Sequence, residues 1–141
     1  MYTFLSKSPE DTLKFAKEFA RNLKVGNVIV LIGDLGSGKT KFTEGILSFF
    51  GIENEISSPT FTIVNEYNSD SVNIYHFDAY RLNNSSEFYS IGGDEYFDKG
   101  ICIIEWGDII EDALPKKYTK ITFERYRENE NFRNLTIEHI S

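Results

Sequence analysis

A glycine-rich segment placed between an apolar run and a helical pattern constrains this chain most strongly. Residues 33–40 read GDLGSGKT and match the pattern G-x-x-x-x-G-K-[ST], which ends here in Lys39 and Thr40. The apolar run Val28–Ile32 predicts a buried strand before the motif, and a helix is expected from Gly38 onward. A plain glycine turn between strand and helix is the alternative. In this context the motif favours a loop that grips phosphate.

Such a loop binds anions because its backbone N–H groups and the following helix N-terminus converge on one point. The Lys39 ammonium is expected to reach the outer phosphates, and the Thr40 hydroxyl to ligate Mg²⁺. Gly36 and Gly38 lack side chains that would block the approach of the backbone to phosphate. The residues predicted to bind a nucleoside triphosphate are Gly33, Asp34, Leu35, Gly36, Ser37, Gly38, Lys39, Thr40 and Lys41.

The length and charge of the chain limit the kinds of protein in which this loop can function. A chain of 141 residues with 40% apolar residues suits one compact domain, residues 1–141. The net charge of −7 disfavours strong direct binding of a polyanion such as tRNA. The N-terminal residues lack the apolar core of a signal peptide, and the only cysteine, Cys102, cannot form an internal disulfide. We therefore expect a soluble cytoplasmic protein with no membrane partner.

The rest of the chain alternates between helical and strand patterns. Ser8 followed by Pro9 predicts a helix start, with apolar residues at helical spacing to about Lys24. Further predictions are an antiparallel hairpin from FTIVNEY and VNIYHFDAY, short helices at SSEFYSIGG and GDIIEDAL, a buried strand at GICIIEW, and a closing antiparallel pair from KITFERY and RNLTIEHI. This order indicates a P-loop NTPase-like α/β domain, with a mixed sheet that has a parallel core, antiparallel additions and helices packed on it.

Two strand-like segments end in an acidic residue, as a phosphate loop requires for metal binding or water activation. They are NIYHFD, which ends at Asp78, and ICIIE, which ends at Glu105. Strand carboxyl ends gather beside the ligand in open α/β sheets, so both are candidates for catalysis and for Mg²⁺ binding together with Thr40. The alternatives are an Asx cap for Asp78 and a surface role for Glu105.

Other polar and aromatic residues near these segments are less decisive. Trp106 is either a residue at the core edge or a surface for a partner. Arg81 is either a charge stabiliser or a member of an ordinary ion pair. His76 is expected to pack on one strand face. Ser58, Pro59 and Thr60 in the segment SSPTF form either a switch that senses the terminal phosphate or a plain polar loop.

Five ordered segments together resemble the bacterial TsaE family, also called YjeE. They are GDLGSGKTKF, SSPTFTIVNEY, YHFDAYRL, GGDEYF and ICIIEW. The resemblance implies an ATPase that acts with the TsaD and TsaB proteins, which form the threonylcarbamoyl group on N6 of adenosine 37 in tRNAs reading codons that begin with A. Contact with tRNA is then only indirect, through that complex, and the transfer itself belongs to the partners.

The resemblance also implies roles for individual residues. Lys39 and Thr40 match the phosphate and magnesium ligands, Asp78 and Glu105 the essential carboxylates, Trp106 their functional neighbour, and SSPTF the switch loop. Ser8 and Arg133 are candidates for the adenine site by family position. Two departures are Lys41 in place of a usual threonine and Gly107 in place of a usual proline. A small-molecule P-loop kinase and a nucleotide-binding adaptor without turnover are the competing hypotheses.

Overall fold

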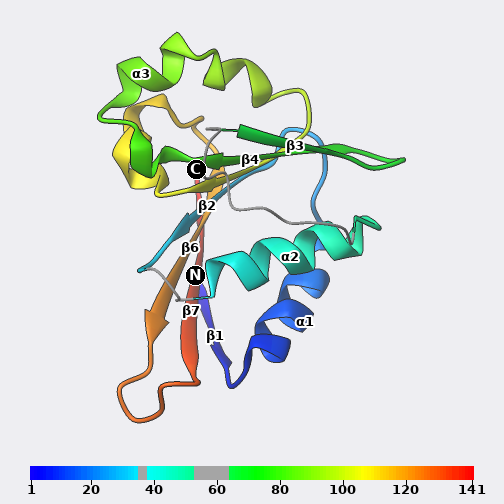
Figure 1. The fold of residues 1–141 in the computed structure, drawn as a ribbon, viewed down its shortest axis with the longest axis vertical. Coiled ribbons are helices and arrows are strands. Elements are labelled where there is room, and N and C mark those ends of the chain that lie inside the picture. The colour runs from blue at the N-terminus through cyan, green and yellow to red at the C-terminus, as the bar shows by residue number, and fades with distance from the viewer. Residues whose placement is uncertain (35–37, 53–63) are drawn as a thin grey trace.

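The computed structural model describes residues 1–34, 38–52 and 64–141. These residues form a single α/β layer structure around a seven-stranded mixed sheet. Two helices cover one face of the sheet, and a shorter helix with several 3₁₀ turns covers the other (Figure 1). The α/β fold with a mixed sheet agrees with the sequence prediction.

The sheet has its parallel core in the centre and antiparallel strands toward both edges. The strand order is β1-β7-β6-β2-β5-β4-β3. β2 pairs in parallel with β5 and with β6, and β4 pairs in parallel with β5. The strands are β1 (Tyr2–Ser6), β2 (Val28–Ile32), β3 (Val64–Asn68), β4 (Asn73–Asp78), β5 (Ile101–Glu105), β6 (Tyr118–Arg125) and β7 (Arg133–Ile140).

Helix α1 (Pro9–Ala20) begins as its sequence predicts. The Ser8 hydroxyl accepts a hydrogen bond from the Asp11 amide at 3.1 Å, and proline occupies the first turn, where no amide donor is needed. The helix ends at Ala20, earlier than the predicted Lys24. The remaining residues continue as turns, in which the Leu23 amide bonds the Ala20 carbonyl at 3.0 Å.

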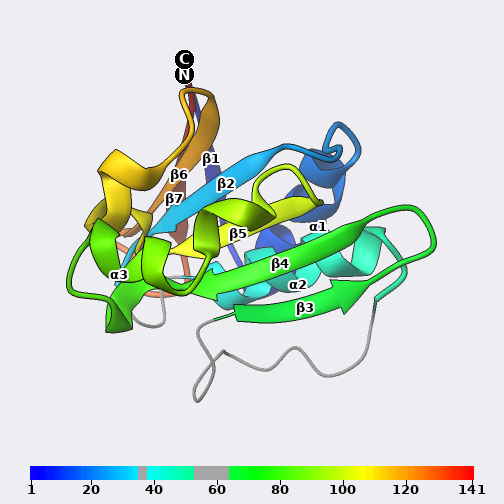
Figure 2. The ribbon, with the colours of Figure 1, turned by 90° about the horizontal axis from the view of Figure 1, so that it is seen from above.

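The other helices lie on opposite faces of the sheet. Helix α2 (Lys39–Phe49) packs with α1, as both views show (Figure 2). Helix α3 (Ser85–Ser90) lies on the other face with 3₁₀ helices at Gly93–Tyr96 and Gly107–Ala113. A kink at Ile110 divides the last of these, so the predicted helix GDIIEDAL is two short 3₁₀ turns.

The hairpin of β3 and β4 and the closing pair of β6 and β7 have the predicted antiparallel pairing. Residues 61–63, which the sequence places at the start of the hairpin, lie outside the described residues. Strand β1 was not predicted from the sequence. This strand pairs with β7 at the opposite end of the chain, for example Phe4 with Leu135. Its five residues are mostly exposed, so local pattern gives little sign of the pairing.

Two apolar clusters hold the sheet between its helical layers. One contains Ile29, Leu31 and Phe42 under α1 and α2. The other contains Val30, Ile104 and Phe88 under α3. Cys102 belongs to the second cluster, and its burial raises the pKa of the thiol to about 12. The thiol therefore stays protonated at neutral pH, in agreement with a packing role.

We expect Gly45→Ala to destabilise the fold by about 1–3 kcal/mol through overpacking. A Cβ at this position would lie 2.5 Å from the Leu13 backbone oxygen and 2.6 Å from the Ala16 Cβ, because α1 and α2 cross closely there. Helix propensity alone would make the alanine variant more stable by about 1 kcal/mol. A loss of stability would therefore report the clash between α1 and α2. Urea unfolding measures it, with Ser48→Ala in the same helix as control. A variant as stable as the wild type would contradict the close crossing.

Among the described residues, no helix has the length and apolar character needed to span a membrane.

Candidate functional site

The carboxyl ends of the central parallel strands bring the two predicted acids side by side. Asp78 at the end of β4 lies directly across from Glu105 at the end of β5, and Glu105 is paired in register with Leu31 of β2. Because residues paired in register on neighbouring strands share a face, both carboxylates project toward the face covered by α1 and α2. The start of α2 lies at the same edge of the sheet.

Helix α2 begins at a glycine instead of a residue with a capping side chain. Its N-cap residue is Gly38, with φ of 107°, a left-handed conformation that glycine adopts without strain. Gly38 has no side chain that could cap the first amides of the helix, which suits them to bind an anion, as expected for a phosphate loop. Leu35, Gly36 and Ser37 lie outside the described residues.

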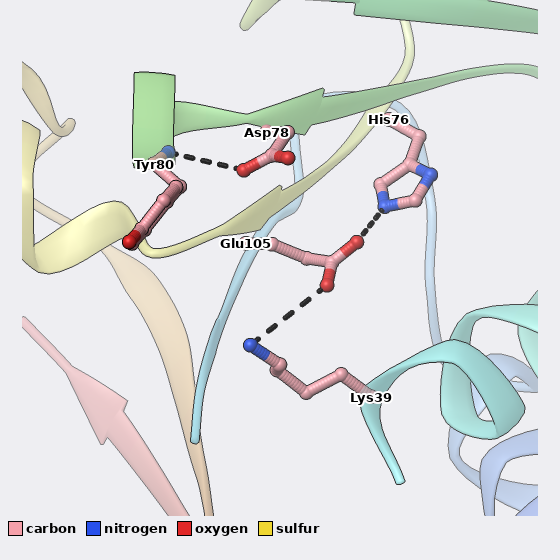
Figure 3. Close-up of polar contacts among 5 residues, drawn as sticks. All are labelled: Lys39, His76, Asp78, Tyr80 and Glu105. Carbon is pink, nitrogen blue, oxygen red and sulfur yellow. Dashed lines mark hydrogen bonds and ion pairs between the residues drawn. The ribbon is translucent and has the colours of Figure 1, made fainter. Parts of the chain in front are cut away.

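Lys39 is buried beside an acid and an aromatic ring. Its Nζ lies 3.9 Å from Glu105 Oε1 (Figure 3). The same atom lies 4.0 Å from the centroid of the Trp106 ring. It has no hydrogen-bond acceptor among the described residues, although its side chain is only 5% exposed. Burial lowers the pKa of the ammonium, and four nearby carboxylates oppose this effect, of which Glu105 is the strongest. A buried cation that lacks an acceptor is suited to an incoming anion.

Glu105 contacts a histidine as well as the lysine. Its Oε2 lies 2.6 Å from His76 Nε2, while Oε1 faces Lys39 (Figure 3). The sequence predicted only packing for His76. The alternation of β4 was the available signal, because it places His76 on the same face as Asp78, two residues further on.

Asp78 makes the cap that was considered as its alternative role. Its Oδ1 accepts a hydrogen bond from the Tyr80 amide at 3.0 Å, at the start of the 3₁₀ helix Ala79–Arg81. The carboxylate is half-buried and also lines the cavity described below. The cap uses one carboxylate oxygen, so it leaves lone pairs on the other for a ligand.

Trp106 is held in an unusual backbone conformation directly after Glu105. It is the one non-glycine residue with positive φ in the described ranges, at 62°. Its amide donates to the Leu31 carbonyl at 3.0 Å, and its ring lies 5.2 Å from that of Tyr80. The next residue, Gly107, packs so closely that a Cβ at this position would lie 2.6 Å from a Val30 methyl group. These contacts direct the indole over Lys39.

A cavity of about 330 Å³ opens at this edge of the sheet. It brings together most of the residues that the sequence predicted for the site. Its lining residues are Ser8, Pro9, Thr12, Gly38, Lys39, Thr40, Lys41, Asp78, Glu105, Trp106, Asn131 and Arg133. Pro9, Thr12 and Asn131 were not predicted, because only the tertiary fold brings the start of α1 and the β6–β7 loop to the start of α2.

Other predicted site residues are placed differently. Gly33 and Asp34 line a separate depression with residues of β6. Ser58, Pro59 and Thr60 lie outside the described residues, so the switch segment remains a prediction from sequence.

The side of the cavity away from the acids is built by Ser8 and Arg133. The Ser8 hydroxyl is occupied by the α1 cap. Arg133 opens β7 and donates from Nη1 to the carbonyls of Glu130 and Phe132, the latter at 2.9 Å. These bonds hold the arginine against the β6–β7 loop.

Lys41 was predicted to bind the nucleotide, but its side chain forms an ion pair with Glu44 at 3.2 Å on the exposed side of α2.

The described residues fit a magnesium ion only in combination with phosphate oxygens. They contain no group of three His, Cys, Asp or Glu side chains that could hold a metal. Thr40, Asp78 and Glu105 nevertheless line one cavity and offer hard oxygen donors. Mg²⁺ commonly binds through one or two protein oxygens, water and substrate phosphates, so this donor set is adequate.

Fold and site together define a small α/β domain of the P-loop NTPase type. A family model described as threonylcarbamoyl adenosine biosynthesis protein TsaE matches residues 6–135. The chain therefore belongs to the TsaE family.

Individual relatives agree with this assignment. The tRNA threonylcarbamoyladenosine biosynthesis protein TsaE of Bacillus subtilis is 44% identical over 124 residues, covering 87% of this chain and 77% of the relative. The protein of the same name from Rickettsia bellii is 38% identical over 133 residues, covering 94% of this chain and 92% of the relative. The crystal structure of Bacillus subtilis YdiB superimposes with a TM-score of 0.85 at 35% identity, covering 99% of this chain and 86% of that one.

Proposed function

We propose that this chain binds and hydrolyses ATP in support of threonylcarbamoyladenosine formation at position 37 of tRNAs that read codons beginning with A. Its membership of the TsaE family and the names of its relatives support the pathway. One structural observation carries the nucleotide assignment. The Lys39 ammonium is buried at the start of α2, in the cavity, without a hydrogen-bond acceptor among the described residues.

In the proposed reaction the phosphates of ATP bind at the amides that open α2. Lys39 transfers its contact from Glu105 to the outer phosphates, which provide the acceptor that its ammonium lacks. Mg²⁺, when bound, neutralises charge on these phosphates, and Thr40, Asp78 and Glu105 are the residues that would hold it directly or through water.

Glu105 is proposed to orient the attacking water and accept its proton. A bond then forms between the water oxygen and the terminal phosphorus, and the bond from that phosphorus to the bridging oxygen breaks. Lys39 and the helix amides stabilise the negative charge that develops. Trp106 shields Lys39 from solvent on one side. Arg133, Ser8 and the β6–β7 loop form the remaining wall, where we place the nucleoside.

We propose TsaD and TsaB as the partners of this cytoplasmic subunit. The net charge of −7 argues against strong tRNA binding by this chain alone, so tRNA is contacted through the complex. A single ATPase domain of this size then acts as a regulatory subunit, and the threonylcarbamoyl transfer belongs to its partners.

ATP turnover by the purified chain, measured alone and with TsaD and TsaB, tests the proposal. We expect slow turnover alone and strong stimulation in the complex, together with restored threonylcarbamoylation of tRNA. Transfer of phosphate to a metabolite instead of water would identify a small-molecule kinase. Binding of ATP without turnover under either condition would identify an adaptor, and either result would overturn the proposal.

A further inference from the structure

His76 is buried in β4, two residues before Asp78, and is not part of the mechanism proposed above. Its side chain is 3% exposed, and it lies opposite Asn65 of β3 and Ile103 of β5 in the sheet register. The Nε2 atom is 2.6 Å from Glu105 Oε2. Because an ionised carboxylate accepts hydrogen bonds and cannot donate them, Nε2 is the donor.

Because of this hydrogen bond, the two Glu105 oxygens have different partners. Oε2 is held by His76 on the side of β4, which leaves Oε1 directed at Lys39, 3.9 Å away (Figure 3). A glutamate side chain has three rotatable bonds, and the end of β5 alone does not fix them. The imidazole therefore selects the orientation in which one oxygen faces the start of α2.

The rest of the imidazole ring gives no stabilising reason for a histidine at this position. Its Nδ1 is buried and has no hydrogen-bond partner among the described residues. Burial of an unpartnered polar atom disfavours the folded state, and the neighbouring positions on this face, Ile74 and Ile103, are apolar. The bond to Glu105 is the polar contact that distinguishes His76 from an aliphatic residue.

We infer that His76 is a positioning residue, which holds Glu105 in the orientation needed for ATP hydrolysis without touching the nucleotide itself. The inference rests on the proposed function. It predicts that the loss of the Nε2 donor lowers kcat and leaves ATP binding almost unchanged, since Lys39 and the α2 amides remain in place.

Replacing His76 by glutamine or by asparagine introduces the same amide donor on side chains of different length. Glutamine carries its amide N–H at about the distance of Nε2, whereas asparagine is one methylene shorter. We expect His76→Asn and His76→Leu to lower kcat by about 10–100-fold, the usual effect of removing a residue that orients a ligand. KM for ATP should change by less than about threefold, and His76→Gln should recover most of the activity. The Gln and Asn pair decides the matter even if the leucine variant does not fold.

A double-mutant cycle then separates positioning from general support of the fold. If His76 acts through Glu105, adding His76→Asn to Glu105→Gln should cost no further activity, whereas independent effects should multiply. Equal kcat for the wild type, His76→Gln and His76→Asn would overturn the inference, as would multiplying effects in the cycle. A wild type that hydrolyses no ATP, alone or with partners, would instead overturn the proposed function and this inference with it.

Discussion

Replacing Lys39 by alanine or methionine is expected to weaken ATP binding by ~10²-fold or more, an effect typical of removing one partner of a buried charged contact. The reason lies in the charges around this ammonium. Asp34, Asp78, Glu105 and Asp108 all act on Lys39 and favour its charged form. Without the lysine, the positive charge that offsets these carboxylates toward the phosphates is lost. Titration calorimetry with ATP and Mg²⁺ measures the change.

Lys14→Ala is the matched control for this experiment. Lys14 is exposed on α1, outside the cavity lining, so its removal lowers the net charge equally without touching the site. The Lys39→Met variant should fold at least as well as the wild type, since it removes a buried cation for which the described residues offer no hydrogen-bond acceptor. Wild-type affinity in either Lys39 variant would show that Lys39 does not bind the phosphates.

Local sequence pattern predicted the elements that form the site because each is specified by its own residues. The apolar run of β2 and the Ser8 cap of α1 are read within a few positions, and the structure places both as expected. Asp78 and Glu105 could be paired because the ends of adjacent parallel strands must meet at one edge of the sheet. Their side-by-side register follows from the observed pairing of β4 with β5.

Contacts between distant segments could not be predicted in this way. Strand β1 joins the sheet by pairing with β7, at the other end of the chain. The β6–β7 loop reaches the cavity because β6 pairs with β2. His76 and Glu105 are 29 residues apart, so their hydrogen bond depends on sheet order. The 3₁₀ turns after Trp106 replace a predicted helix because of the kink at Ile110 and the close approach of Gly107 to Val30.

In the proposed mechanism, the contact between Lys39 and Glu105 means that ATP binding rearranges charges within the site. The Lys39 ammonium moves from Glu105 to the outer phosphates in this mechanism. Its transfer leaves Glu105 with one oxygen held by His76 and the other free to engage water or Mg²⁺. In this scheme phosphate binding itself releases the acid that hydrolysis requires. Lys39 and Glu105 should consequently affect different steps when they are substituted separately.

Glu105→Gln and Glu105→Ala are therefore expected to retain ATP binding and to lose hydrolysis. Removal of a carboxylate beside Lys39 takes away a competitor for the ammonium, so the Kd for ATP should stay the same or fall several-fold. kcat should drop by ~10²–10⁴, the range typical for the loss of a group that takes a proton in the transition state. Single-turnover hydrolysis with radiolabelled ATP, alongside calorimetry, separates the two effects.

Glu18→Gln is the control for lost charge, since Glu18 lies outside the cavity lining in an exposed pair with Arg21 at 3.2 Å. Of Glu105→Gln and Glu105→Ala, the glutamine variant tests the role of the carboxylate more directly. It keeps a carbonyl oxygen that can accept from His76, so the local packing persists while the base is lost. Wild-type turnover in Glu105→Gln would show that this residue does not accept the proton. Loss of ATP binding in the same variant would show that Glu105 holds the metal on which the phosphates depend.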